Sequence, residues 1–202
     1  MTKPATIGFI GLGAMGGAVA RRLAQGPFTV RVYDRDPLAV QRAVEAGAEA
    51  VVNAASAASD ADVVMTSLPT PEIVEAVWAE LVPQLGEDVI ALDLSTIDPA
   101  CARRLSGLIE TSPAAGLVCC TLGRTPQHAE RGEVPGFVGG PAGLVARLAP
   151  VLDQMTDSVH DMGSVEGATI FKLISNHIGM TNLVVLAEGY ALACRAGIDA
   201  DT

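Results

Sequence analysis

Three glycines near the start of the chain, Gly11, Gly13 and Gly16, restrict most strongly what this sequence can fold into. They follow a short apolar run, residues 6–11, that is typical of a buried strand, and they open a helical pattern over residues 14–25. In this G-x-G-x-x-G spacing, the first glycine permits a tight turn. The second lets a ligand approach the backbone, and the third allows close packing of helix on strand. Because a helix N-terminus attracts phosphate groups, the sequence predicts a Rossmann domain that binds a dinucleotide. We expect the loop to contact it at Gly11, Leu12, Gly13, Ala14, Met15 and Gly16.

The end of the second predicted strand, residues 28–34, bears on the choice of cofactor. Asp34 lies about 20 residues after the glycines, where a carboxylate bonds the adenine ribose hydroxyls of NAD. Arg35 follows directly, and an arginine at this place could instead bind the 2′-phosphate of NADP. A surface Asp–Arg pair without a role in binding is the third possibility. We expect NAD or NADP as cofactor and favour NAD.

Strand-like and helix-like segments alternate from the glycine loop to about residue 162. The further predicted strands are residues 62–68, 89–94, 116–121, 137–138 and 158–161. The predicted helices are 37–46, 71–81, one beginning at 98–99, and 144–155, while 122–134 is interpreted as a polar loop. This alternation predicts an α/β fold with a doubly wound, mostly parallel sheet.

After Gly163 the pattern changes to one long helix over residues 164–196, which Gly197 would close. We therefore divide the chain into an NAD(P)-binding Rossmann domain, residues 1–162, and an interdomain helix, residues 163–202. The second segment would begin an all-helical domain that is truncated or missing in this sequence. The helix should expose Leu183, Val184 and Leu186, so we expect a homodimer formed through it.

Composition excludes several classes of partner. The formal net charge is −10 and no basic stripe is present, which argues against nucleic acid. The four cysteines contain no C-x-x-C pair, so we expect reduced thiols, a cytoplasmic location and no metal site. They are Cys101, Cys119, Cys120 and Cys194.

The two ends of the sequence give no sign of targeting. The first residues pass directly into a strand pattern, so we expect no signal peptide. The helix at residues 164–196 is apolar but interrupted by polar side chains, and we therefore expect no membrane partner. These interruptions are Lys172, Asn176, Asn182 and Glu188.

Within that helix, Lys172 and Asn176 are four residues apart and therefore share one face. Apolar residues surround them. From the residues alone, a lysine that extends along the apolar surface to solvent is favoured over one that lies in a cleft.

Five segments in order resemble the β-hydroxyacid dehydrogenase family, of the 3-hydroxyisobutyrate dehydrogenase type with a 6-phosphogluconate dehydrogenase-type NAD-binding domain. They are IGFIGLGAMGGAVA, SLPTPEIVEAVW, DLSTIDP, TLGRTPQHAERG and GATIFKLISN. The resemblance implies that Lys172 is the catalytic residue, that Asn176 holds substrate, and that Leu68, Pro69 and Thr96 lie near the cofactor. Gly163 is displaced by one position from the family pattern. Imine reductases of similar architecture lack the lysine, so Lys172 favours alcohol and carbonyl chemistry.

One loop departs from the family pattern. Where most members have S-G-G-T-P, this chain has Leu122, Gly123, Arg124, Thr125 and Pro126. The loop is similar to that of the sulfolactaldehyde reductase branch, in which an arginine binds the sulfonate. By this resemblance Gly123, Arg124 and Thr125 would bind an anionic group of the substrate, since a guanidinium suits an oxyanion. A solvated Arg124 without such a role is the alternative, and the nearby His128 is interpreted as a surface residue.

These features predict an NAD(P)-dependent β-hydroxyacid dehydrogenase or aldehyde reductase that acts on CH–OH donors. The substrate would be a small anionic β-hydroxy acid or its aldehyde, such as a hydroxyisobutyrate-like or sulfolactaldehyde-like compound. The alternative is a non-catalytic dinucleotide-binding module, or an inactive fragment that lacks the helical domain.

Overall fold

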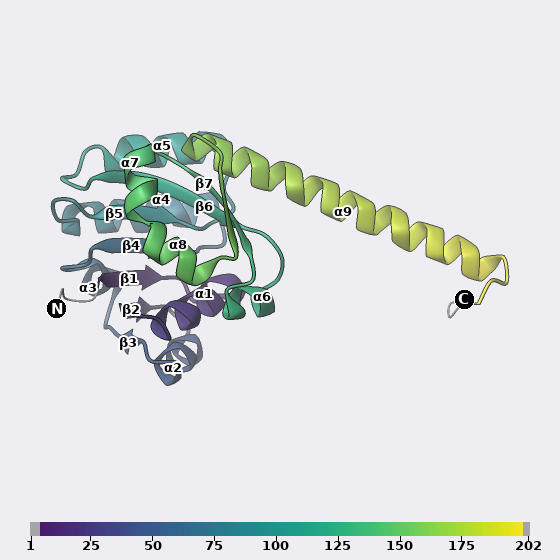
Figure 1. Cartoon of the computed structure of the whole chain (residues 1–202), viewed down its shortest axis with the longest axis horizontal. Helices are drawn as coiled ribbons and strands as arrows, with labels where there is room; N and C mark the ends of the chain where they lie inside the picture. The colour runs from purple at the N-terminus through teal and green to yellow at the C-terminus, as the bar shows by residue number, and fades with distance from the viewer. Residues whose placement is uncertain (1–4, 200–202) are drawn as a thin grey trace.

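The computed structural model describes residues 5–199, and in that range it contains one eight-stranded sheet with helices on both faces (Figure 1). The strand order is β3-β2-β1-β4-β5-β6-β7-β8. All neighbouring strands are parallel except β6 and β7, which are antiparallel. The predicted doubly wound, mostly parallel sheet is therefore confirmed. The strands are β1 Thr6–Ile10, β2 Thr29–Tyr33, β3 Glu49–Ala50, β4 Val63–Thr66, β5 Ile90–Asp93, β6 Gly116–Leu122, β7 Pro135–Gly139 and β8 Ser158–Asp161.

Several helices begin at the capping residues that the sequence indicates. Asp36 and Asp98 accept hydrogen bonds from backbone N–H groups at the starts of α2 and α5, and a proline follows each of them. The helices are α1 Ala14–Ala24, α2 Pro37–Glu45, α3 Ala54–Ala58, α4 Pro71–Leu81, α5 Pro99–Ile109, α6 Pro126–Arg131, α7 Ala142–Arg147, α8 Ala149–Met155 and α9 Val165–Arg195, with a 3-10 turn at Val82–Gln84.

The structure corrects three local predictions. Residues 122–134, predicted as loop, contain α6, a helix too short for apolar periodicity to indicate. The single helix predicted at 144–155 is two helices, because Pro150 has no N–H group with which to continue the hydrogen-bond ladder of α7. Strand β3 and the alanine-rich α3 were not predicted, since two-residue strands and uniformly small side chains leave no pattern.

The apolar core has two layers, one on each face of the sheet. Helices α1, α2, α6, α7 and α8 cover one face, where Leu23 and Leu152 are buried. Helices α3, α4, α5 and the first turns of α9 cover the other, around Trp78 and Leu105. The sheet is therefore buried on both faces, as parallel sheets generally are.

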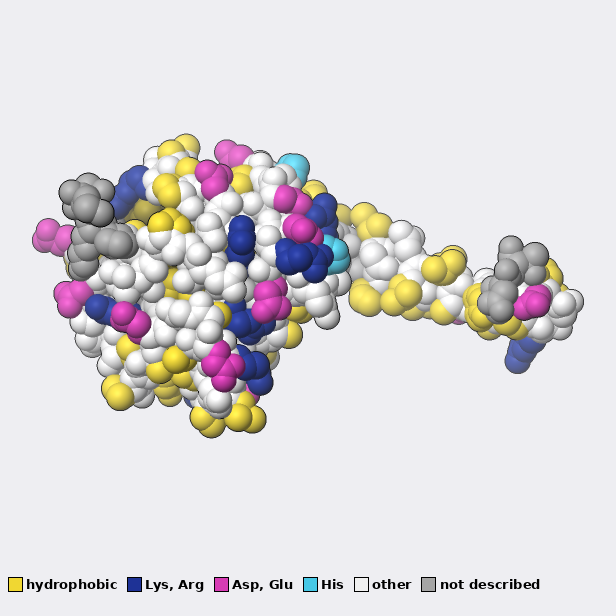
Figure 2. Space-filling model, turned by 60° about the horizontal axis from the view of Figure 1, so that its bottom comes forward, with side chains coloured by type: hydrophobic (Ala, Val, Ile, Leu, Met, Phe, Trp, Pro, Cys, Tyr) yellow, Lys and Arg dark blue, Asp and Glu magenta, His cyan; other side chains and the backbone are white. Residues whose placement is uncertain are grey.

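Helix α9 leaves the domain and projects far beyond it (Figure 1). Its buried residues, Val165, Ala168 and Thr169, all lie at its beginning. Beyond them, Leu183, Val184 and Leu186 are 56%, 57% and 70% exposed, as expected, and apolar side chains follow the helix (Figure 2). By length and composition alone, with a mean hydropathy of 1.3 over an 18-residue window, α9 could also cross a membrane. The polar side chains within α9 therefore do not by themselves exclude a membrane span, and the expectation of no membrane partner stays a prediction.

Candidate dinucleotide and substrate site

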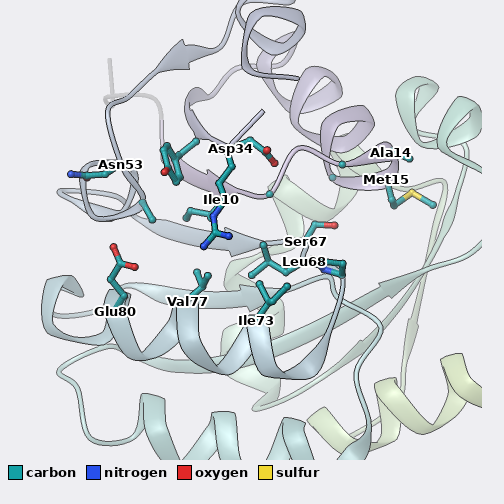
Figure 3. A pocket seen from close by; sticks show the side chains of 17 residues that line it. Ile10, Ala14, Met15, Asp34, Asn53, Ser67, Leu68, Ile73, Val77 and Glu80 are labelled. Atoms are coloured by element: carbon teal, nitrogen blue, oxygen red, sulfur yellow. The ribbon is translucent and has the colours of Figure 1, made fainter. Parts of the chain in front are cut away.

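A cleft of about 530 Å³ opens at the carboxyl ends of β1, β2 and β4 (Figure 3). Ligands of open α/β sheets bind at this edge. Nine of the predicted cofactor residues line it: Gly11, Gly13, Ala14, Met15, Gly16, Asp34, Arg35, Leu68 and Pro69. Leu12 lies instead on an adjoining pocket of about 380 Å³, and the exposed Thr96 is outside both linings. The opposite wall comes from α4, through Ile73, Val77 and Glu80 (Figure 3).

The three glycines of the loop differ in what surrounds their Cα atoms. Gly11 has φ +94°, a left-handed conformation that favours glycine, and a Cβ there would meet Leu68 Cδ2 at 2.9 Å. A Cβ on Gly16 would lie 2.8 Å from Cβ of Ser67. At Gly13 a Cβ would enter open space in the cleft. Gly11 and Gly16 therefore permit close packing within the protein, while Gly13 keeps the cleft clear for a ligand.

The start of α1 fits a pyrophosphate. Gly13 is its N-cap, and no side chain caps the first backbone N–H groups of the helix. Such groups carry the positive end of the helix dipole and bind phosphate oxygens. The bare backbone at Gly13 and the uncapped helix thus form a cradle of suitable chemistry for a dinucleotide.

Asp34 is fixed at the cleft by two backbone groups. Its Oδ2 accepts a hydrogen bond of 2.6 Å from the backbone N–H of Leu12, and its Oδ1 accepts one of 2.8 Å from the N–H of Asp36. These bonds hold the carboxylate at the rim of the cleft, with the exposed Arg35 beside it. The structure thus places in one cleft the two residues that were predicted to bear on the choice between NAD and NADP.

A buried polar network behind the cleft was not predicted. Asp93, the last residue of β5, is fully buried, and its Oδ1 accepts hydrogen bonds from Thr66 Oγ1 at 2.6 Å and Ser95 Oγ at 2.7 Å. Burial raises the pKa of the carboxyl to about 6, although the two hydroxyls and the backbone N–H of Ser95 lower it. Ser95 Oγ also accepts the N–H of Leu68 at 2.9 Å, which connects the network to the cleft. Only the polar end of an otherwise apolar strand, D-L-S-T, gave a signal for it.

Lys172 lies at the end of β6. Its Nζ donates a hydrogen bond of 2.7 Å to the carbonyl oxygen of Leu122, and the side chain is partly buried. Loss of contact with water lowers the pKa of the amine from its ordinary value of 10.5. Thr121 fixes α9 to the same strand, because its hydroxyl donates to the carbonyl of Ala168 at 3.1 Å. Lys172 therefore has a defined position and does not extend freely into solvent.

Arg124 is held by neighbouring groups. Its Nη1 donates to Asp157 Oδ2 at 2.6 Å and to the carbonyl oxygen of Glu133 at 2.5 Å, while about half of the side chain is exposed. Arg124 has φ +56°, which is rare outside glycine. The Thr125 hydroxyl lies 2.8 Å from Nδ1 of His128, in an exposed contact across the start of α6.

Of the other two predicted substrate residues, Gly123 adjoins Arg124 in the loop and Asn176 follows Lys172 on α9. At Gly123, a Cβ would meet Pro135 Cγ at 2.7 Å, so the loop packs tightly on β7. Asn176 is exposed on α9, one turn beyond Lys172. Because β6 runs parallel to β5, its last residue, Leu122, lies at the same edge of the sheet as the cleft. Lys172 and the predicted substrate residues are absent from the lining of the cleft. These substrate residues are Gly123, Arg124, Thr125 and Asn176.

Comparison with known proteins assigns the fold and the cofactor. Residues 6–163 match the model of the NAD binding domain of 6-phosphogluconate dehydrogenase. The chain is 32% identical over 201 residues to 3-hydroxyisobutyrate dehydrogenase of Pseudomonas aeruginosa. This match covers 96% of the chain and 65% of the dehydrogenase. It is 34% identical over 197 residues to 3-sulfolactaldehyde reductase of Escherichia coli. This match covers 95% of the chain and 65% of the reductase. The chain thus spans 65% of the length of both curated relatives.

A solved structure extends the similarity. The 3-hydroxyisobutyrate dehydrogenase of Mycobacterium tuberculosis, in complex with L-serine, superposes with a TM-score of 0.90 at 27% identity. The match covers 98% of this chain and 67% of that one, so it includes most of α9. The matched domain, together with the cradle at Gly13, identifies the cofactor as NAD or NADP.

Proposed function

Because the chain belongs to the β-hydroxyacid dehydrogenase family, we propose that it transfers hydride between NAD(P) and a small anionic β-hydroxy acid or its aldehyde. The position of Lys172 carries this proposal. Its amine is partly buried at the sheet edge to which the cofactor cleft also opens. Burial lowers the pKa of this lysine from its ordinary value of 10.5, which favours the neutral amine that a general base requires.

In the oxidation direction, the neutral amine of Lys172 takes the proton of the substrate hydroxyl. A bound NAD(P) would supply the hydride acceptor for the carbon that carries this hydroxyl. In the reduction direction, the ammonium of Lys172 donates a hydrogen bond and then a proton to the carbonyl oxygen. The carbonyl of Leu122 orients Nζ in both states, because it accepts a hydrogen bond from an amine or an ammonium.

The substrate side of the proposal rests on Arg124. Among the described residues, both of its hydrogen bonds use Nη1, so Nε and Nη2 are left for an anion. Asp157 and the Glu133 carbonyl hold the guanidinium in place, which limits the entropy that binding would cost. We propose that Arg124, with Gly123 and Thr125, binds a terminal carboxylate or sulfonate, and that Asn176 bonds a neighbouring oxygen.

NAD is the favoured cofactor. The carboxylate of Asp34 is fixed by two backbone N–H groups and suits the 2′- and 3′-hydroxyls of a ribose. The same negative charge would repel a 2′-phosphate. Arg35 offsets this repulsion in part, because it is exposed beside the carboxylate.

A homodimer through α9 completes the proposal. The exposed apolar side chains at Leu183, Val184 and Leu186 extend the surface that a second copy would cover. All four cysteines are free thiols, which agrees with a reducing, cytoplasmic environment.

The test is a substrate panel with purified chain. Sulfolactaldehyde, succinic semialdehyde and methylmalonate semialdehyde are each supplied with NADH and, separately, with NADPH, and loss of absorbance by the reduced cofactor is followed. The proposal predicts turnover of at least one anionic aldehyde and faster turnover with NADH. Binding of NADH without turnover of any member would instead support the non-catalytic dinucleotide-binding alternative.

A further inference from the structure

In the buried network at the end of β5, the donor and acceptor of each hydrogen bond are fixed. Thr66 and Ser95 each donate their hydroxyl hydrogen to the same oxygen, Oδ1 of Asp93. Because each hydroxyl has one hydrogen, its lone pairs are then left to accept. Thr66 Oγ1 accepts from Nε1 of Trp78 at 2.9 Å, and Ser95 Oγ accepts from the backbone N–H of Leu68. The acceptor oxygen of Asp93 therefore sets the orientation of both hydroxyls.

The network ends at the wall of the cofactor cleft. Leu68 lines the cleft, and the preceding residue, Ser67, lies directly against the glycine loop. A Cβ on Gly11 or on Gly16 would collide with atoms of Ser67, and the N–H of Ser67 donates to the carbonyl of Ile10 at 3.0 Å. Any displacement of the segment 67–68 is therefore passed to the loop that faces the dinucleotide.

The cost of the arrangement indicates a role beyond packing. Oδ2 of Asp93 has no hydrogen-bond partner among the described residues, although the whole side chain is buried. An unpartnered buried carboxylate oxygen is destabilising, and an apolar residue at this place would avoid that cost. What Asp93 supplies that an apolar residue cannot is the shared acceptor oxygen.

We propose that Asp93 is a positioning residue for the cofactor. Through Ser95 it fixes the backbone of Leu68 as one wall of the NAD(P) cleft, and through Thr66 it fixes Trp78 behind that wall. The assignment rests on the NAD(P) cleft of the proposed function and not on the hydride transfer.

Two variants of Asp93 distinguish the effect of its acceptor oxygen from the effect of its negative charge. Asp93→Asn keeps a carbonyl oxygen that can accept both hydroxyls, whereas Asp93→Leu is of similar size and has no acceptor. We expect Asp93→Leu to weaken NADH binding about tenfold, in line with the loss of hydrogen bonds that order the wall. Asp93→Asn should bind NADH within about threefold of the wild-type chain, because its acceptor oxygen is retained.

Trp78 gives a second readout, because it is the only tryptophan of the chain and its indole N–H belongs to the network. Its emission spectrum should change in Asp93→Leu and stay close to wild type in Asp93→Asn. Val118→Ala, a core change on the neighbouring strand β6, is the matched control for general destabilisation. It should lower the melting temperature and leave both the NADH dissociation constant and the Trp78 emission unchanged.

Ser95→Ala keeps the proposal testable if Asp93→Leu does not fold. It removes only the hydroxyl that accepts from Leu68, and we expect NADH binding about fivefold weaker than in the control Ser106→Ala. The assignment is overturned if Ser95→Ala and a folded Asp93→Leu bind NADH as the wild type does, or if Asp93→Asn is as weak as Asp93→Leu. A wild-type chain that binds NADH but reduces no aldehyde would overturn the proposed reaction and leave this assignment in place.

Discussion

The amine of Lys172 donates a 2.7 Å hydrogen bond to the carbonyl oxygen of Leu122, the last residue of strand β6. Burial is the cause that lowers the pKa of this lysine. A lysine acts best as an acid–base catalyst when its pKa lies near the working pH. The burial that places Lys172 at the end of β6 therefore also shifts its pKa in the direction that such catalysis requires.

The pH dependence of this amine is the first prediction. Since the lowered pKa favours the neutral form, turnover in the oxidation direction should rise with pH and level off below pH 10.5, while turnover in the reduction direction should fall over the same range. The chain contains only Lys3 and Lys172, so NMR of ¹³C-methylated lysines can separate their titrations. The signal that disappears in Lys172→Met should titrate below pH 10.5. A Lys172 signal that titrates at 10.5 or above would contradict the assigned role.

The glycine loop gives a prediction about binding without loss of stability. In Gly13→Ala the added Cβ meets no protein atom and extends into the cleft. We expect NADH binding to weaken at least about tenfold, because the backbone must approach the pyrophosphate closely, with an unchanged melting temperature. Gly143→Ala, where a Cβ also meets nothing but lies outside the cleft, is the control and should bind NADH normally.

Arg124 tests the anionic part of the substrate. Arg124→Ala should raise KM for an anionic aldehyde about 10-fold to 100-fold with little effect on NADH binding, since a charge-assisted hydrogen bond contributes about 1.5–3 kcal/mol. Arg131→Ala is the matched control, because Arg131 is an exposed arginine that pairs with Glu133 at 2.8 Å. Equal KM values for the two variants would remove Arg124 from the substrate site.

Asp93 predicts a pH-dependent contribution to stability. Burial raises its pKa in the folded chain from 3.8 to about 6, so the folded state binds this proton more tightly than the unfolded state. The resulting stability is fully present below pH 3.8 and is lost as the pH rises to about 6. Asp93→Asn does not titrate. Its free energy of unfolding relative to wild type should therefore gain about 3 kcal/mol between pH 3.5 and pH 7.

Urea unfolding followed by the emission of Trp78 at several pH values measures this difference. The exposed Asp153→Asn is the control and should show no such trend. A difference between Asp93→Asn and wild type that stays constant with pH would mean that Asp93 has an ordinary pKa in the folded chain.

The features of the fold that could be predicted from the sequence are those that depend on residues close together in the chain. The strand, turn and helix around Gly13 follow each other directly, and the caps at Asp36 and Asp98 are local patterns as well. The short helix α6 was not predicted, because six residues give apolar periodicity too little length.

Contacts between distant segments could not be predicted in this way. Asp157, which holds Arg124, belongs to another part of the chain, and the partners of Asp93 come from different elements. Parallel strand order brings Thr66 of β4 beside Asp93 of β5, and that order is a property of the whole sheet. The resemblance to a known family indicated Lys172, whereas local pattern favoured a lysine that extends to solvent.

The proposed reaction is tested most directly by Lys172→Ala, with turnover and cofactor binding measured on the same preparation. Loss of a general acid–base group lowers turnover about 100-fold to 10,000-fold. We predict a decrease of this size in NADH oxidation with the best anionic aldehyde, at an NADH dissociation constant within about twofold of wild type, since Lys172 does not line the cofactor cleft. Turnover by Lys172→Ala equal to that of the wild-type chain would contradict the account.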